Sequence, residues 1–91
     1  MTVHWTKRAE RNRDAIIDYI AQDNPQAALD LDDYIEHLTT TTLATHPEAF
    51  KPGRKKGTRE MVLHPHYVLV YRAKNRAVTV LRLLHTSQQW P

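Results

Sequence analysis

Three histidines in the second half of the chain are the residues best suited to chemistry. His85 ends the stretch LRLLH at residues 81–85, and His64 and His66 stand two residues apart, just before the run YVLVYR. An imidazole titrates near neutral pH, so it can accept or release a proton under cellular conditions. The simpler interpretation is that each histidine is a polar residue at a strand end. Their chemistry therefore depends on whether the fold brings them together.

A predicted β-hairpin supplies a geometric reason to expect this. The residues between the last two strand-like runs, AKNRA, have the composition of a tight turn. If Asn75 and Arg76 form a two-residue turn, His66 lies opposite His85; a turn one residue earlier places His64 there instead. In either register a second imidazole faces His85, with β-carbons about 5 Å apart. We therefore expect a histidine cluster at one end of the sheet.

Histidines beside fixed positive charge are the residue types that metal-free cleavage of RNA requires. In that reaction a 2′-hydroxyl attacks the neighbouring phosphorus, a base removes its proton and an acid protonates the departing 5′ oxygen. Arg59, which ends the basic stretch KPGRKKGTR, is predicted to reach the histidines and to stabilise charge on the phosphate. His-x-His with a cross-strand histidine also has metal-ligand geometry. Because the neighbouring positive charge disfavours a cation, we expect no metal and no organic cofactor.

Charge is divided unevenly between the two halves of the sequence. Residues 1–50 carry four Lys/Arg and nine Asp/Glu, a balance of −5, whereas residues 51–91 carry nine Lys/Arg and Glu60 alone, a balance of +8. Such asymmetry indicates a surface that meets a polyanion such as nucleic acid. Two alternatives would also account for the charge asymmetry: the basic surface binds an acidic protein, or its charges are simply solvated.

The elements that position these residues are predicted from period and capping signals. Thr6 is a suitable N-cap for a first helix, and Asn24 followed by Pro25 begins a second. The expected elements are a short edge strand TVHW, a helix from Thr6 to about Gln22, a helix from Asn24-Pro25, a mobile basic loop HPEAFKPGRKKGTRE, and the strands REMVLH, HYVLVYRA and AVTVLRLLH.

This order, β-α-α-β-β-β, predicts an α+β fold in which a helical hairpin packs on a small, mostly antiparallel sheet. Ninety-one residues suffice for one domain spanning 1–91. The chain has no cysteine, which excludes disulfides and thiolate chemistry. Its apolar runs are too short to span a bilayer and its N-terminus lacks a secretion signal, so we expect a cytoplasmic protein without membrane contact.

The same residues resemble the RelE/ParE toxin superfamily of bacterial type II toxin–antitoxin modules. The resemblance covers essentially the whole chain and is most specific in GTRE at 57–60, VLVYR at 68–72 and LRLLH at 81–85. It implies the β-α-α-β-β-β fold. Two branches share that fold: the YafQ/RelE branch of ribosome-dependent mRNA endoribonucleases, and the ParE branch of DNA gyrase inhibitors, which have no known nuclease role.

The local resemblance is greatest to the YafQ/RelE branch, which implies a toxin that cuts mRNA on the ribosome. In that interpretation His85 is the general acid, His66 the general base or its positioning partner, and Arg59 the phosphate stabiliser, while His64 or His66 covers a missing role. Val62 and Thr86 depart from the catalytic pattern of this branch. The expected RNA and rRNA contacts are Lys51, Arg54, Lys55, Lys56, Arg72 and Arg82.

The alternative implied by the same resemblance is the ParE type, which inhibits gyrase by protein contact. The histidines and the basic residues would then shape a contact surface. Both branches imply a cognate antitoxin, whose disordered tail folds onto the toxin and covers apolar grooves or basic surface. The partners expected are therefore an antitoxin and either the ribosome with its mRNA or DNA gyrase.

Overall fold

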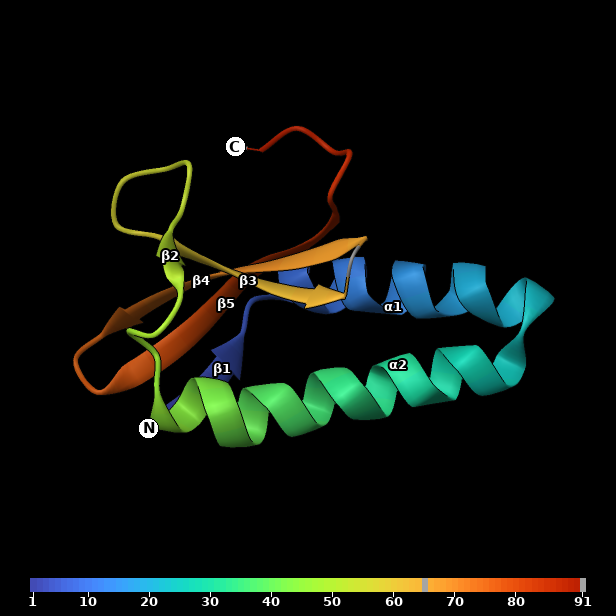
Figure 1. The fold of residues 1–91 in the computed structure, drawn as a ribbon, viewed down its shortest axis with the longest axis horizontal. Helices are drawn as coiled ribbons and strands as arrows, with labels where there is room; N and C mark the ends of the chain where they lie inside the picture. The colour runs from blue at the N-terminus through green and yellow to red at the C-terminus, as the bar shows by residue number, and fades with distance from the viewer. Residues whose placement is uncertain (65, 91) are drawn as a thin grey trace.

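A five-stranded sheet carries the helical hairpin on one face. The computed structural model describes residues 1–64 and 66–90, and Figure 1 shows its layers. In chain order the elements are β1 (Thr2–Trp5), α1 (Lys7–Asp23), α2 (Pro25–Leu38), a π-helical turn η1 (Thr39–Leu43), β2 (Lys51–Pro52), β3 (Arg59–His64), β4 (Tyr67–Lys74) and β5 (Ala77–His85). The predicted α+β fold is confirmed, although β2 lies within the segment predicted as loop.

The strand order in the sheet is β1-β5-β4-β3-β2. β1 pairs with β5 in parallel, whereas the other three neighbouring pairs are antiparallel. The first strand therefore forms one edge of the sheet beside the last strand. The sheet is mostly antiparallel, as predicted. Among the described residues, no helix is both long and apolar enough to cross a membrane.

Two N-caps set where the helices begin, and the contacts of one arginine hold the helices in position. The Thr6 hydroxyl accepts the Ala9 amide at 3.0 Å, and the Asn24 side chain accepts the Ala27 amide at the same distance, so both predicted N-caps are confirmed. Arg13 of α1 donates to Asp32 of α2 at 2.8 Å and lies over the Trp5 ring of β1 at 4.9 Å. This arginine therefore ties α1 to both α2 and the edge strand.

The threonine run that follows α2 winds into a wider turn instead of ending the helix at once. The hydroxyl of Thr39 donates to the carbonyl of Ile35 at 2.9 Å, and that of Thr40 donates to Glu36 at 2.8 Å. Threonine hydroxyls that bond back to the preceding turn compete with the regular helical ladder. The run thus accounts locally for the π-helical turn η1.

The β4–β5 hairpin has the predicted turn but not the predicted register at its far end. Asn75 and Arg76 both have positive φ, 54° and 61°, as a two-residue type I′ turn requires. The register shifts by one residue between Val70 and Tyr71. Beyond this bulge Tyr67 is paired with His85, so the prediction that His66 or His64 lies directly opposite His85 is wrong.

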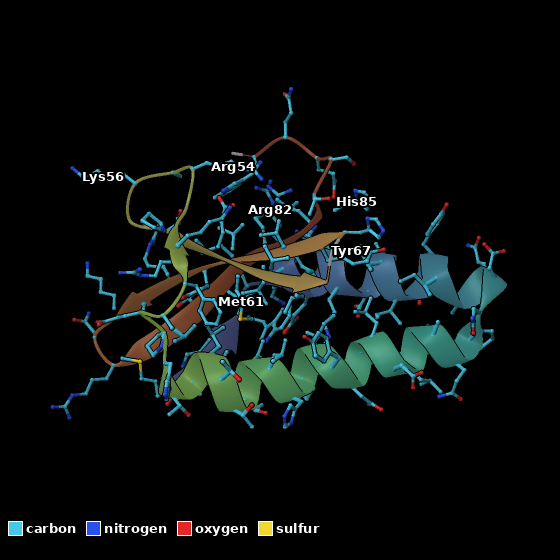
Figure 2. All side chains as sticks on the ribbon, in the orientation of Figure 1. Arg54, Lys56, Met61, Tyr67, Arg82 and His85 are labelled. Carbon is cyan, nitrogen blue, oxygen red and sulfur yellow. The ribbon has the colours of Figure 1, made fainter. Side chains whose placement is uncertain are left out.

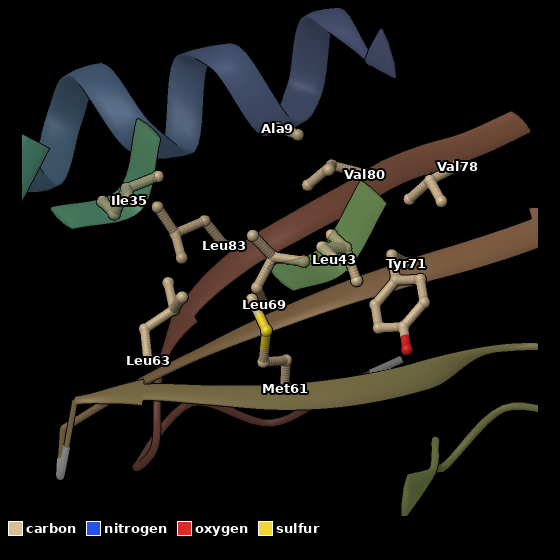
Figure 3. Packing of buried hydrophobic residues seen from close by; sticks show 10 residues of the cluster. All are labelled: Ala9, Ile35, Leu43, Met61, Leu63, Leu69, Tyr71, Val78, Val80 and Leu83. Atoms are coloured by element: carbon tan, nitrogen blue, oxygen red, sulfur yellow. The ribbon is translucent and has the colours of Figure 1, made fainter. Parts of the chain in front are cut away.

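The main core lies between the sheet and the helices, as Figure 3 shows. Its buried members are Ala9, Ile35, Leu43, Met61, Leu63, Leu69, Tyr71, Val78, Val80 and Leu83. Because strand side chains alternate between faces, a smaller cluster of Val68, Val70 and Leu84 forms on the other face, where Trp90 packs against it. The site described next uses both faces.

Candidate functional site

His66 and His85 lie side by side at the end of the sheet where β4 begins and β5 ends. Their rings are stacked, with centroids 5.7 Å apart and planes within 5° of parallel. Tyr67 meets the His85 ring edge-on at a centroid distance of 5.6 Å, and both labelled side chains are visible in Figure 2. The structure thus brings these two histidines together as predicted. For His64 only the backbone is described, and its side chain lies outside the described part of the structure.

The two ring nitrogens of His85 differ in their hydrogen bonding. Nδ1 accepts the backbone N–H of Ser87 at 3.1 Å and lies 2.7 Å from the hydroxyl oxygen of the same serine. An Nδ1 that accepts an N–H must be unprotonated, so the neutral ring carries its proton on Nε2. The His85 amide in turn donates to the Gln88 side chain at 2.8 Å. The turn after β5 therefore orients the imidazole through Nδ1 and leaves Nε2 for an outside partner.

A hollow of about 260 Å³ opens beside His85 on the helix-covered side of the sheet. His85 shares this side with Leu83, because residues two apart on a strand face the same way. The hollow is lined by Asn12, Ala15, Ile16, Tyr19, Tyr67, Leu83, His85 and Gln88. Its described lining includes neither lysine nor arginine, so no fixed cation of the lining is available to hold a phosphate there.

Arg59 lies at the other end of the strands from His85. Its strand partner is Tyr71, whereas the partner of His85 is Tyr67. Four residues along β4 correspond to about 13 Å. The Arg59 guanidinium donates instead to the carbonyl oxygen of Phe50 at 2.8 Å. The prediction that Arg59 reaches the histidines is therefore wrong: the β3–β4 register carries it away from them, and it anchors the segment before β2.

Four cations surround a second hollow, of about 360 Å³, that lies between the start of α1 and the C-terminal tail. It is lined by Thr6, Arg8, Lys55, Arg72, Leu81, Arg82 and Trp90. Arg82 lies over the Trp90 ring at 5.8 Å and donates to the side chain of Asn12 at 3.2 Å. Burial, and secondarily the charge of Arg8, lowers the pKa of Arg82 below its ordinary value. The structure thus groups three of the predicted RNA-binding residues, Lys55, Arg72 and Arg82.

The other predicted RNA-binding residues belong to the strand and loop beside this hollow. Lys51 and Lys56 are exposed. Arg54 pairs with the buried carboxylate of Glu60, with an Nε–Oε2 distance of 3.5 Å, and its backbone N–H donates to the same oxygen at 2.9 Å. Figure 2 shows Arg54 and Arg82 on the side of the sheet opposite Met61. Arg54 therefore has a structural partner, whereas Lys51 and Lys56 project into solvent.

Metal binding was the competing interpretation of the histidines. Across the described residues, no group of three His, Cys, Asp or Glu side chains is placed so that it could hold a metal ion. What the described geometry offers is proton transfer at the histidine pair and anion binding at the basic hollow. These two capacities belong to separate hollows, which share none of their described lining residues.

Comparison with known families decides the identity of the fold. Residues 3–90 match the family model of the ParE toxin of the type II toxin–antitoxin system parDE. This chain belongs to that family. It is a toxin of a type II toxin–antitoxin module and a member of the RelE/ParE superfamily, as the sequence resemblance implied.

Individual relatives agree with this placement in the ParE family. "Putative toxin Y4kP" of Sinorhizobium fredii is 41% identical over 92 residues, covering 98% of this chain and 92% of its own length. The chromosomal ParDE system of P. aeruginosa matches with a TM-score of 0.77 at 25% identity, covering 93% of this chain and 95% of that one.

This ParE family member and YafQ share the same fold. YafQ from E. coli matches with a TM-score of 0.59 at 11% identity, over 93% of this chain and 92% of that one. Both values are lower than those for the ParDE system. The local likeness to YafQ that the sequence indicated is therefore not reflected in the overall similarity.

Several residues that shape the two hollows of this ParE family member were missed by sequence reasoning. Arg8 and Trp90 complete the basic hollow, although they stand near opposite ends of the chain. Ser87 and Tyr67 orient and contact His85. The early arginine carried no signal within its own acidic half of the sequence. The tail serine and glutamine could have been noticed, since polar side chains directly after a strand often bond to its last residues.

Proposed function

We propose that this ParE family toxin inhibits DNA gyrase by protein contact and does not cut RNA. The observation that carries the proposal is the separation of the two chemical capacities. His85 lines one hollow, Arg72 and Arg82 line another that shares none of its described lining residues, and Arg59 is bound to Phe50 at the far end of the strands. A general acid must lie within hydrogen-bond reach of the leaving oxygen, beside the cations that hold the phosphate.

The experiment compares the two possible targets with the same purified protein. Gyrase supercoiling is measured with increasing toxin, and a translation reaction programmed with a defined mRNA is read by primer extension. We expect loss of supercoiling and intact mRNA. The His85→Gln variant should keep its inhibitory potency within about threefold, since truncating one exposed contact typically costs less than about 1 kcal/mol. Ribosome-dependent cuts within the translated frame, lost in His85→Gln, would overturn the proposal.

The mRNA endoribonuclease remains a second candidate because of one observation, the stack of His66 on His85. Two imidazoles in contact could divide the roles of base and acid, and bound rRNA could supply the missing cation and order the substrate. In that case His66→Gln and His85→Gln should each lower the cleavage rate by at least about 100-fold. The same primer-extension assay measures this.

We infer in addition that a cognate antitoxin covers the apolar surface of the hairpin. Tyr19, Leu29 and Tyr34 are exposed at 71%, 59% and 45%. Tyr34 also lines a groove of about 470 Å³, together with Ile20, Ala27, Asp30, Leu31, His66 and Tyr67. Such surface favours an amphipathic helix laid into the groove. Co-purification with the product of a neighbouring gene tests the inference, and Tyr34→Asp should weaken the complex. The compartment we propose is the cytoplasm, where gyrase acts.

A further inference from the structure

The basic hollow brings residues from four parts of the chain to one spot. Arg8 comes from the first turn of α1, Lys55 from the loop before β3, Arg72 from β4 and Arg82 from β5. Trp90 covers the apolar cluster of Val68, Val70 and Leu84 and forms part of the wall. The cations thus converge through the tertiary fold, and three of the four are arginines.

No negative charge balances these cations within the lining. Its seven described residues include no aspartate or glutamate. Among the described residues, the one ion pair made by any lysine or arginine of the basic half joins Arg54 to Glu60, outside the lining. Burial lowers the pKa of Arg82, and the charge of Arg8 lowers it further; the second, smaller effect comes from the gathering of like charges. A bound anion would relieve this repulsion.

Trp90, in the wall of the hollow, carries a buried indole N–H. Trp90 Nε1 is buried, and it is the one buried side-chain nitrogen or oxygen of the described residues that lacks a hydrogen-bond partner. An unsatisfied buried donor is costly, and native structures contain few of them. An indole N–H only donates, as do guanidinium and ammonium groups. The four cations of the lining are donors alone, so the hollow favours an acceptor-rich anion.

We propose that the hollow binds the phosphodiester backbone of a nucleic-acid strand. A phosphodiester carries one charge and two acceptor oxygens per nucleotide, and arginine forks match its geometry. A single side-chain carboxylate would leave most of the four charges unbalanced, whereas a strand brings a phosphate every few ångströms. Exposed Lys51 and Lys56 in the neighbouring strand and loop extend the positive surface beyond the hollow. This favours a polymer over a single small anion.

This inference does not depend on the gyrase proposal, because binding is measured with the toxin alone. Fluorescence anisotropy of labelled twelve-nucleotide oligomers, about the span of small single-strand binding sites, is followed at several salt concentrations. Separate arms use single-stranded DNA, duplex DNA and single-stranded RNA, which share the phosphodiester and identify its source. Inorganic phosphate serves as a competitor. We expect binding that weakens with salt, with a logarithmic slope of about −1.4 to −2.8 for two to four phosphate contacts on a single strand.

Two double variants test whether the oligomer binds at this hollow or through positive charge spread over the surface. The double variant Arg72→Ala/Arg82→Ala should weaken binding at least tenfold and make the salt slope shallower by about 1.4, because two contacts are removed. The matched control Lys74→Ala/Arg76→Ala removes the same charge from exposed positions at the hairpin turn and should change affinity less than threefold. Thermal unfolding of both variants checks that they fold. If Arg82→Ala unfolds the protein, Arg72→Ala alone provides the comparison.

Three results would overturn the proposal. These are absence of binding to every oligomer at low salt, equal weakening by the two double variants, and binding of a poly-glutamate peptide in preference to all the oligomers. The last result would assign the hollow to an acidic protein segment. In W5F protein, quenching of the remaining tryptophan by the bound oligomer would support placement of the strand at Trp90.

Discussion

At the scale of single residues, Glu60 is the acid on which the basic loop depends. It is the one acid among residues 51–91, and it is 3% exposed. Its carboxylate accepts the Arg54 amide and pairs with the Arg54 guanidinium. A carboxylate buried among cations is stabilised when it accepts hydrogen bonds from them. Glu60 therefore fixes the base of the loop that presents Lys55 to the basic hollow.

We expect Glu60→Ala to lower the free energy of unfolding by about 2 kcal/mol, because it leaves the Arg54 N–H unsatisfied and removes a buried contact. Urea denaturation measures the change. Glu48→Ala is the matched control, since Glu48 is exposed and the removal of such an acid should cost less than about 0.5 kcal/mol. Equal losses in the two variants would contradict a specific role for Glu60.

Tyr71 links stability to pH. Burial raises its pKa above the ordinary value of 10.0, against a smaller opposing effect of Arg59, and its hydroxyl donates to the carbonyl of Pro47. Above about pH 10 the unfolded tyrosine loses its proton while the folded one keeps it. The unfolded state then binds fewer protons, so the free energy of unfolding must fall as pH rises through this range.

We therefore expect Tyr71→Phe to flatten the decline in unfolding free energy above about pH 10, while costing about 1 kcal/mol at neutral pH through the lost hydrogen bond. Urea titrations at a series of pH values provide the measurement. Tyr19→Phe serves as the control because Tyr19 is 71% exposed, and it should follow the wild-type curve. The same slope in Tyr71→Phe and wild type would show that the hydroxyl is not the linked group.

The sequence predicted which residue types form the site, but it predicted only part of how they group in space. His66 and His85 could be brought together because a hairpin relates them by a countable register. Arg8 and Trp90 could not be joined by such counting, since their proximity depends on how α1 and the tail lie against the sheet. Arg59 was misplaced because its distance from His85 depends on the β3–β4 register, which the sequence of the intervening turn leaves open.

At the scale of elements, one bulge determines what His85 faces. Between Val70 and Tyr71 the β4–β5 register shifts by a residue, and every pairing beyond it moves by one. Asn75 correctly indicated the turn, because asparagine tolerates a positive φ. A bulge has no comparable composition signal, so Tyr67 took the place predicted for a histidine. His66 still reaches His85 through ring stacking rather than strand pairing.

Arg76 is a strained member of the same turn. Its φ is 61°, in the left-handed region that costs a side-chain-bearing residue about 1 kcal/mol or more, and type I′ turns favour glycine at this second position. We expect Arg76→Gly to raise the free energy of unfolding by about 0.5–1 kcal/mol. Lys74→Gly, within β4, should lower it by a similar amount. Chemical denaturation distinguishes the two signs, and destabilisation by Arg76→Gly would contradict the strain argument.

At the scale of the whole molecule, the two layers differ in charge as well as in structure. The acidic half of the sequence forms the helical hairpin, and the basic half forms β2–β5 and the loop before β3. Figure 1 shows the hairpin on one side of the sheet, with the β2–β3 loop and the C-terminal tail on the other. The sequence predicted this layering because period and charge change together near residue 50. The parallel pairing of β1 with β5 had no such signal.

Local stability should also differ between the sheet and the helical hairpin. Seven of the ten residues in the main core belong to β3, β4 and β5, whereas the 17-residue α1 contributes only Ala9. The turn that joins α1 to α2 projects beyond the sheet in Figure 1. Segments with few buried apolar contacts open locally at a lower free energy than the core does. The far half of α1 is therefore expected to open without unfolding of the sheet.

Native-state hydrogen exchange tests this expectation. Amides of Ile17–Asp23 should exchange on the order of 100-fold faster than those of Val70 and Val80, because the sheet amides require global unfolding. Leu83→Ala, which removes a core side chain, should lower the protection of the sheet by its full unfolding cost and change that of Ile17–Asp23 much less. Equal protection in the two regions would mean that the hairpin and the sheet unfold as one unit. Unequal protection would show that the hairpin opens alone, and an antitoxin that binds the closed hairpin should then raise the protection of Ile17–Asp23.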